Sequence, residues 1–505
     1  MKAERWEEET MAVAGIDIGS SGCKIIVYDE NGQDIFKVHQ NYAGKRYQEQ
    51  EEIDANDIWS SVRKSIIIAA QKIGNIEAIT VTSFGESFVL LDEMDQVLFP
   101  VLMYTDIRGS EQATQMMKDF DFKKVAAVTG AKIHYMFSLP KLMWIKQHHA
   151  DIFRKTAHIL LIQDYIVYML TGTLQIDYSI AARTLAFDIK EKRWDQELLN
   201  YGGISEKLLS RPVPSGTPAG KIKSELSERW GISDNIIIVT GCHDQVAAAV
   251  GCGIFAEGSA VDGAGTVECI TPVIEGFPDS DILSEGGIAI VPYIIPNKYV
   301  CYAFSFAGGS LIKWYKDNFA KYEIILAEKK QTDSYSLLEE DIEAVPGNIL
   351  VVPHFNGAAT PYMDGGAKGA IIGLSLSHTA KDIYKSLMEG VAYEMLGNII
   401  FLEKAGIKLN YLHSTGGGAK SALWMQIKAN MLNKELISVQ GDAAGTVGSA
   451  MLAAVALGQY KNIEDAAKKF VHMAHKYKAR KDYTKQYAEQ YEKYKKLYNL
   501  LKTVR

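Results

Sequence analysis

Two short glycine-containing segments in this 505-residue sequence have residue types that can bind phosphate. Gly19-Ser20-Ser21 follows an apolar stretch that carries Asp17, and Gly263-Ala264-Gly265-Thr266 follows a similar stretch in the second half. Consecutive backbone N–H groups in such a turn form a concave anion site, and a neighbouring carboxylate suits Mg²⁺. An ordinary hairpin explains either turn taken singly. Two matched turns are more specific, because a triphosphate held from both sides needs one in each half.

A further carboxylate, Asp244, lies in the segment Gly-Cys-His-Asp-Gln at 241–245, between a predicted strand at 236–240 and a short helix at 246–250. A carboxylate at a strand end, near a helix N-terminus, is well placed to take a proton from a substrate hydroxyl. A helix cap is the alternative. Cys242 and His243 have no partner ligands at useful spacing, so we interpret both as packing residues.

Other segments add binding groups. Gly416, Gly417 and Gly418 stand between a predicted strand at 409–414 and a helix at 422–432, where they would let a flat ring approach the backbone. Tight strand–helix packing is the alternative explanation. Glu86, Asp106 and Arg108 complete the polar set: carboxylates near a cleft bind vicinal hydroxyls, whereas surface salt bridges are the alternative.

A repeated pattern of strands must position these groups. Predicted strands at 12–18 and 24–28 flank the first glycine turn, and strands at 259–262 and 268–273 flank the second. Matching Gly19 to Gly265 gives an offset of 246 residues, roughly half the chain, so the sequence suggests a duplication.

Helical patterns and one long loop follow these strands. Apolar spacing predicts a helix at 58–73 capped by Asp57, and another that begins after Thr379 and stops near Gly406. Tyrosines at helical spacing between 483 and 498 indicate a packing face rather than a nucleic-acid stacking surface. The Gly/Pro-rich segment 353–366 is long enough to suggest a functional loop.

Composition bounds the class of protein. Apolar residues make up 47% and charged residues 23%, and 54 basic against 61 acidic residues give a net charge of −7. This balance provides no basic field for nucleic acid or an anionic membrane.

Five cysteines without a CxxC pair favour a reducing compartment. Residues 1–10 lack the apolar core of a secretion signal, and the uncharged run 443–460 fits a buried helix better than a membrane span. We therefore expect a cytoplasmic protein of two or three domains.

Taken in order, these motifs resemble those of the FGGY family of carbohydrate kinases, and they cover the chain from about residue 15 to 457. The matching segments are 15–21 with Lys24, 136–144, 170–172, 177–179, 241–245, 263–266, 369–389 and 416–421. There are departures. The loop 357–361 lacks the usual Gly-Glu-Arg, Asn430 replaces an aspartate, and Phe84-Gly85-Glu86 replaces the Gln-Met-His of xylulose kinases. Glu86 resembles the residue that glycerol kinases have at this place, but Gly85 stands where those enzymes carry an arginine.

The resemblance implies an α/β fold of two actin/hexokinase-like (ribonuclease H-like) lobes, each a mixed five-stranded sheet flanked by helices, with a cleft between the lobes. The expected division is a sugar- and phosphate-binding lobe at 1–254 and a nucleotide-binding lobe at 255–505. The implied reaction is ATP-dependent phosphorylation of a sugar or polyol, with a ketose such as a pentulose as the expected acceptor.

The family's roles carry over by residue. Asp244 would be the general base and Asp17 would orient Mg²⁺. The substrate would contact Glu86, Tyr104, Asp106, Asp244 and Gln245. ATP would contact Gly19, Ser20, Ser21, Lys24, Gly265, Thr266, Gly308, Gly309, Gly416, Gly417 and Gly418. The expected partner is the small-molecule substrate, with no nucleic acid or membrane, and a homodimer is left open.

Two other classes of function fit the same fold. One is an actin- or chaperone-like ATPase, which has no use for Glu86, Asp106 and Asp244 converging on one cleft. The other is a catalytically silent sugar-binding module, against which the retained Asp17 and Asp244 argue. Sugar-stimulated release of ADP distinguishes the kinase from the ATPase.

Overall fold

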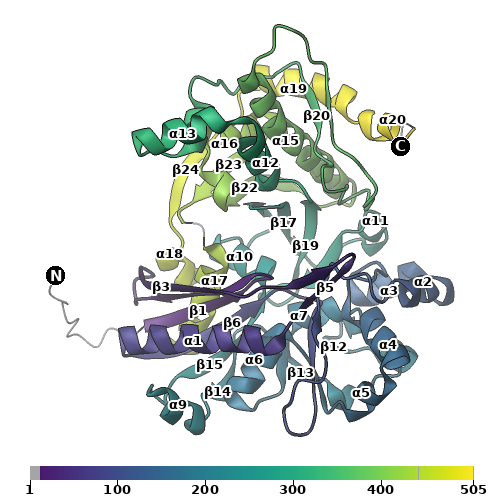
Figure 1. Ribbon diagram of the computed structural model, residues 1–505, viewed down its shortest axis with the longest axis vertical. Coiled ribbons are helices and arrows are strands. Elements are labelled where there is room, and N and C mark those ends of the chain that lie inside the picture. Colours follow the sequence, from purple (N-terminus) through teal and green to yellow (C-terminus); the bar gives the residue numbers. More distant parts are fainter. Residues whose placement is uncertain (1–11, 442, 504–505) are drawn as a thin grey trace, which may run out of the picture. The chain divides into compact units, whose positions relative to one another are not determined.

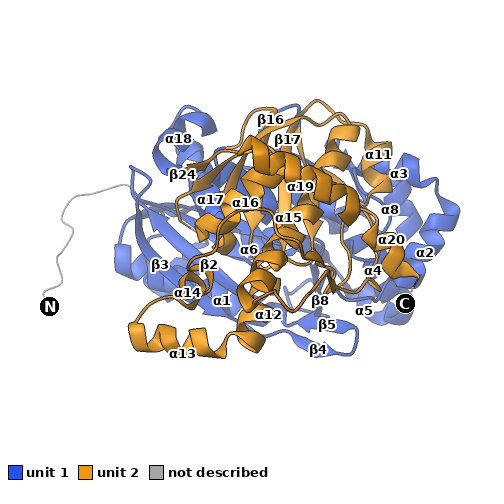
Figure 2. Cartoon of the chain, turned by 90° about the horizontal axis from the view of Figure 1, so that it is seen from above, with its two compact units in different colours: residues 1–253, 291–298, 443–471 blue, residues 254–290, 299–442, 472–505 orange. Residues whose placement is uncertain are grey.

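The computed structural model describes residues 12–441 and 443–503, and these divide into two compact units (Figure 2). Unit 1 comprises the chain up to Gly253 with 291–298 and 443–471, and unit 2 comprises 254–290, 299–442 and 472 onward. One change of unit, at 253/254, lies next to the expected division at 254/255, and two later segments return to unit 1. Residues 1–10, considered above for a secretion signal, lie outside the described residues.

Unit 1 is built on a mixed sheet whose central strands are parallel. β1 pairs in parallel with β6 and β6 with β15, while β2 runs antiparallel to β1. Within the described residues the order is β14-β15-β6-β1-β2-β3. The bounds are β1 (Ala12–Ile18), β2 (Gly22–Tyr28), β3 (Asp34–Asn41), β6 (Ile76–Ser83), β14 (Thr217–Lys221) and β15 (Ile237–His243).

Unit 2 contains the same arrangement. β16 runs antiparallel to β17 and parallel to β22, and β22 is parallel to β23, so β19-β17-β16-β22-β23 repeats β3-β2-β1-β6-β15. The two units thus repeat one strand arrangement, as the suggested duplication predicts. The bounds are β16 (Gly258–Ala264), β17 (Glu268–Glu275), β18 (Ala289–Pro292), β19 (Lys298–Ser305), β22 (Leu409–Thr415), β23 (Glu435–Val439) and β24 (Met473–Tyr477).

The prediction of five strands per sheet is wrong, because outer strands widen both sheets. In the described part of the chain, β14 makes the first sheet six-stranded, and β18 and β24 make the second seven-stranded. β14 contains a proline and a glycine, and four of the five residues of β24 are exposed. Such strands lack the apolar alternation by which a strand is recognised in a sequence.

Helices cover both faces of the first sheet (Figure 1). α1 (Ala55–Ile73) packs on one face, and α17 (Ala444–Ala456) lies on the other with α10 (Asp244–Gly251). The uncharged run 443–460 is thus largely a buried helix, as predicted. None of the helices in the described residues combines the length and hydropathy needed to cross a bilayer. The cap of α1 is Asp54 rather than Asp57: its side chain accepts from Asn56 N–H, and Asp57 lies in the first turn.

In unit 2 the long helix α15 (Ala380–Lys404) begins at the predicted cap, Thr379, whose hydroxyl and backbone form a capping box with Asp382. The predicted tyrosine face is confirmed on α19 (Lys481–Tyr494). The Tyr487 hydroxyl donates to Glu389 Oε1 at 2.9 Å, and the Tyr494 hydroxyl donates to Glu394 Oε2 at 2.7 Å. Buried tyrosine hydroxyls therefore each donate to one oxygen of a buried carboxylate of α15.

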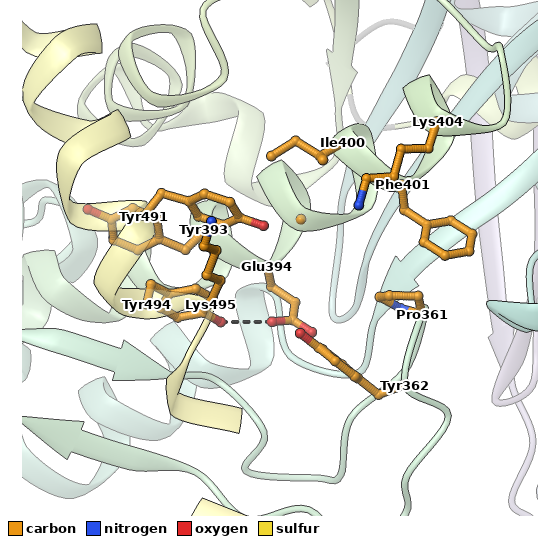
Figure 3. A pocket seen from close by; sticks show the side chains of 11 residues that line it. Pro361, Tyr362, Tyr393, Glu394, Ile400, Phe401, Lys404, Tyr491, Tyr494 and Lys495 are labelled. Atoms are coloured by element: carbon orange, nitrogen blue, oxygen red, sulfur yellow. Dashed lines mark hydrogen bonds between the residues drawn. The ribbon is translucent and has the colours of Figure 1, made fainter. Parts of the chain in front are cut away.

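A small pocket of about 150 Å³ remains where α15, α19 and the segment after Thr360 meet (Figure 3). Glu394 and rings such as Tyr393 and Tyr494 line it, and the dashed bond joins Tyr494 to Glu394. No residue predicted for catalysis or binding belongs to its lining. The pocket is therefore a consequence of packing α19 against α15 rather than the expected site.

A buried charge cluster joins two strands of unit 2 to α16 (Ala422–Leu432). Lys428 Nζ lies 3.0 Å from Asp262 Oδ2 and 2.7 Å from Glu268 Oε1, and all three side chains are at most 1% exposed. The Ser414 hydroxyl also donates to Asp262 Oδ2 at 3.0 Å. One ammonium group thus compensates two carboxylates deep in the unit.

Replacing Lys428 by Met should lower the free energy of unfolding by about 3–5 kcal/mol, because it leaves two carboxylates buried without a cation. Chemical denaturation followed by circular dichroism measures this change. Lys476→Met is the control: it removes a half-exposed pair with Glu435 in the same sheet and should cost less than about 1 kcal/mol. Equal stability of the two variants would contradict the importance given to the cluster.

Candidate active site

Three parallel strands of unit 1 end side by side. Ile18 of β1 lies opposite Ser83 of β6, and Ser83 lies opposite His243 of β15. Phe84 N–H donates to the Ile18 carbonyl at 3.0 Å and ties two of these ends together. Ligands of open α/β sheets bind at the carboxyl ends of the strands. This edge brings together the segments that carry the predicted carboxylates Asp17, Glu86 and Asp244.

Asp17 lies at the end of β1, opposite Lys24 in the β1–β2 register. A Cβ added to Gly445 would stand 3.3 Å from Asp17 Oδ2, so the carboxylate lies beside the first turn of α17. A helix N-terminus stabilises a negative charge. Burial nevertheless raises the pKa of Asp17, and the charge of Lys24 partly opposes the shift. No pattern in the sequence indicated that α17 lies beside Asp17.

The first glycine turn has backbone N–H groups that are available to a ligand. Gly19 N–H donates to the Gly22 carbonyl at 2.9 Å, whereas the N–H groups of Ser20 and Ser21 have no acceptor among the described residues. The Tyr42 hydroxyl donates to the Gly19 carbonyl and helps to hold the turn in place. Sequence reasoning missed this contact. Two adjacent backbone donors beside a carboxylate fit a hydrated Mg²⁺–phosphate group.

Asp244 is the first residue of α10, and its neighbour His243 is the N-cap, without a side-chain cap bond. The helix-cap interpretation of Asp244 is therefore wrong. Asp244 Oδ1 is buried and accepts no hydrogen bond from the described residues, although His243 Nδ1 lies 3.3 Å away. Burial raises the pKa of Asp244 to about 7, and the charges of Asp17 and Glu86 add to the shift. Burial also lowers the pKa of His243 well below its ordinary value, so His243 is neutral.

Glu86 occupies a tight turn after β6 and is almost fully buried. Its Oε1 accepts hydrogen bonds from Arg183 Nε at 2.6 Å and from Arg183 Nη2. Arg183 lies on a short 3₁₀ helix (Ala182–Thr184) beside the end of β15, where His243 N–H donates to the Ser179 hydroxyl at 2.9 Å. Sequence reasoning missed Arg183. A buried carboxylate requires a cation nearby, but no spacing in the sequence indicates which one.

Of the other residues predicted to contact the substrate, two are placed so that they could do so. Tyr104 lies close enough to Glu86 and Asp244 for their charges to add to the burial that raises its pKa. Gln245 directly follows Asp244 on α10, and its side-chain amide bonds to no described residue. Asp106 is different. Its Oδ1 accepts from Arg108 N–H and Nε, both at 2.9 Å, and its Oδ2 accepts from Glu51 N–H and from Arg108 Nη2. Both oxygens of Asp106 are therefore taken by a salt bridge, but this pair is buried and is not the surface salt bridge that the alternative supposed.

The glycine segments predicted to bind nucleotide come together in unit 2. Gly309 N–H donates to the Gly265 carbonyl at 2.8 Å and Ser310 N–H to the Thr266 carbonyl at 3.0 Å, which seats the 265–266 turn on the start of α12 (Gly309–Phe319). A Cβ at Gly308 would stand 2.8 Å from the carbonyl carbon of Val267. The Gly309 amide is thus occupied, and this residue supports the turn.

The third glycine segment packs against the same turn. Gly416 has φ 91°, and a Cβ there would stand 2.7 Å from the Ala264 carbonyl oxygen, whereas Gly417 has nothing within 4 Å of that position. One glycine therefore permits close packing and the next leaves an open surface suited to a flat ring. Clusters of three or more His, Cys, Asp or Glu able to hold a metal are absent from the described part of either unit.

Comparison with known proteins agrees with this architecture. Residues 12–251 match the N-terminal domain model of the FGGY family of carbohydrate kinases, and residues 284–457 match its C-terminal domain model. A xylulose kinase from Bacillus subtilis is 28% identical over 501 residues, which are 97% of this chain and 96% of that protein. A gluconokinase from Bacillus licheniformis is 27% identical over 485 residues, 95% and 94% of the two chains.

The fold also matches solved structures. A ligand-bound xylulose kinase from Lactobacillus acidophilus superposes with a TM-score of 0.87 at 24% identity, over 97% of this chain and 98% of that chain. Together with the two related mixed sheets, this likeness confirms the predicted class of two actin-like lobes.

Gly416→Ala should lower the free energy of unfolding by about 1–3 kcal/mol, because alanine is strained at this positive φ and its Cβ would clash with backbone. Gly417→Ala, one residue on, meets open space and should stay within about 0.5 kcal/mol of the parent. Thermal and denaturant unfolding of both variants make the comparison. A similar loss in both would contradict the close packing of Gly416 on the 264–265 backbone.

Proposed function

Because the chain belongs to the FGGY family of carbohydrate kinases, and is therefore an ATP-dependent kinase of a sugar or polyol, we propose a pentulose as its acceptor and Asp244 as its general base. One observation supports the base above all. Asp244 carries a buried oxygen without a hydrogen-bond donor, at an edge where three strands end, and its pKa is raised to about 7. A base works best when its pKa lies near the working pH.

In the proposed reaction, Asp244 accepts the proton of the acceptor hydroxyl while that oxygen attacks the γ-phosphorus of ATP and ADP leaves. Glu86 binds a second hydroxyl of the acceptor, and Tyr104 and Gln245 supply further hydrogen bonds. Phosphoryl transfer asks little covalent chemistry of a protein, so the positioning of the acceptor and the balance of charge provide most of the acceleration.

Asp17 and the first glycine turn would serve the phosphates. The N–H groups of Ser20 and Ser21 are available to phosphate oxygens, with Lys24 nearby on β2. The donor set fits Mg²⁺, since Asp17 is a carboxylate close enough to Asp244 to raise its pKa, and this ion needs only one or two carboxylates besides water and phosphate. Bound there, Mg²⁺ would neutralise developing charge on the phosphates.

Unit 2 would hold the nucleotide. We assign Gly265 and Thr266 to phosphate and the open surface at Gly417 to the adenosine. Gly308, Gly309, Gly416 and Gly418 would support these segments, because a side chain at Gly418 would meet Ala264 and Trp424. Unit 1 would correspondingly bind the acceptor. The relatives named for xylulose and for gluconate support a sugar-derived acceptor of five or six carbons.

Coupled ADP release across pentuloses, hexuloses, aldonates and polyols tests the substrate. We expect a pentulose to give the highest kcat/KM and to raise ADP release well above the rate without acceptor. ADP release that is equally fast with and without every acceptor would contradict the kinase and favour the ATPase alternative.

The assignment of Asp244 as the base predicts the direction in which kcat/KM changes with pH. Asp244 accepts a proton only when ionised, so kcat/KM for the acceptor should rise with pH, about tenfold per unit below pH 7, and level off above it. Asp244→Asn should remove this ascending limb and lower kcat by about 10²–10⁴-fold, while ATP affinity and melting temperature stay near the parent's.

Asp92→Asn serves as the matched control. It makes the same exchange in a turn of unit 1, where Asp92 accepts from the N–H groups of Met94 and Gln96, and should leave the pH profile unchanged. Near-parental turnover of Asp244→Asn would show that another group takes the proton.

A further inference from the structure

The turn that carries Glu86 is held rigidly. Glu86 has φ 65°, a conformation that non-glycine residues rarely adopt, and Ser87 N–H donates to the Gly85 carbonyl at 2.7 Å across it. The Ser138 hydroxyl, at the start of α4 (Ser138–His148), donates to the Glu86 carbonyl at 2.6 Å. Strained backbone of this kind persists only where its surroundings fix it, and it clusters at functional sites.

Arg183 is fitted to this turn as closely as Glu86 is. Both side chains are 6% exposed, and the guanidinium carbon lies 5.0 Å from the ring centre of Phe137. A Cβ at Gly85 would stand 2.7 Å from Arg183 Cγ, so the aliphatic part of Arg183 occupies the space that any side chain at position 85 would need. Gly85 thus gives Arg183 its access to Glu86.

The other basic groups around this pair are bound to backbone carbonyls or have a pKa that burial lowers. Burial lowers the pKa of Lys141 to about 7, and its Nζ donates to the carbonyls of Tyr135 at 2.8 Å and Met136 at 3.0 Å. His243 is neutral, as described above, and burial lowers the pKa of His134 to about 4.

When Asp244 is ionised, as a base must be, the groups close to it therefore include one carboxylate more than the guanidinium of Arg183 compensates. Arg108 is bound to Asp106 and Glu52, so its charge is balanced. Glu86 and Asp244 are two carboxylates, and Arg183 is the cation that acts on both.

The geometry points to the Glu86–Arg183 pair as a specificity determinant that selects an uncharged ketose or polyol over an acid sugar. This inference rests on the proposed function, since it places the acceptor beside Asp244. Glu86 Oε1 is occupied by Arg183, while Oε2 accepts no hydrogen bond from the described residues and can receive one from a substrate hydroxyl. The carboxylate of an aldonate would instead meet two carboxylates and a guanidinium that is already ion-paired.

The test begins with the unmodified protein. The values of kcat/KM are measured by ADP release for xylulose, an uncharged ketopentose, and for gluconate, an aldonate. We expect the ratio to favour xylulose by at least about tenfold. A preference for gluconate overturns the inference and leaves the kinase proposal standing. Absence of acceptor-dependent turnover with every sugar overturns the proposed function, and this inference with it.

Glu86→Gln then isolates the charge. It keeps the size and a hydrogen-bond acceptor but leaves Arg183 uncompensated, so the gluconate-to-xylulose ratio of kcat/KM should rise at least about tenfold. The double variant Glu86→Gln/Arg183→Gln restores the charge balance, and its ratio should return to within about threefold of the parent's.

A merely structural role for the pair predicts that both acceptors lose kcat/KM equally. An unchanged ratio in Glu86→Gln, with parental melting temperature and KM for ATP, overturns the inference. If Glu86→Gln does not fold, the uncharged double variant and the unmodified protein still decide, because both must prefer xylulose.

Discussion

The close approach of α17 to β1 and α10 is the constraint on which the rest of unit 1 depends. A Cβ at Gly15 or at Gly251 would collide with carbonyl groups of α17, those of Thr446 and Ala444. Side chains of ordinary size would therefore push this helix off the sheet. Because it lies close, its first turn reaches Asp17, and the Thr82 and Ser449 hydroxyls meet at 2.7 Å behind the ends of the strands. The positions of the proposed catalytic groups thus follow from backbone packing. Their side chains stand at the edge of the sheet where β1, β6 and β15 end.

Under the proposed function, the two units use one strand topology for two kinds of chemistry. In unit 1 the edge where β1, β6 and β15 end carries carboxylates, and the buried cation there is an arginine brought in from a short helix. In unit 2 the equivalent turn is lined by glycines, and its carboxylates, Asp262 and Glu268, are turned inward to Lys428. A polar acceptor needs carboxylates at the surface of the site, whereas a nucleotide needs close access to backbone. The duplicated strands satisfy both needs because side chains alternate between the two faces of a strand.

Much of this arrangement could be predicted from the sequence because it is local. Strand–glycine–strand patterns gave the central strands of both sheets, and Thr379 marked the start of α15 because a cap is a short-range interaction. The outer strands β14 and β24 could not be found, since hydrogen bonding to a neighbour, rather than apolar alternation, makes them strands. Arg183 and the first turn of α17 were missed for a related reason. Both reach the site from distant parts of the chain. A single sequence does not show which distant segments lie together in space.

The return of residues 443–471 to unit 1 bears on how the chain acquires its structure during synthesis. A nascent chain that has reached Gly253 already contains every strand of the first sheet but not α17, which covers one of its faces. The small apolar residues of β1 and β6 on that face stay uncovered until nearly two hundred further residues have followed. Residues 1–253 thus lack the helix that covers one face of their own sheet, and the ribosome must release almost the whole chain before that face is closed.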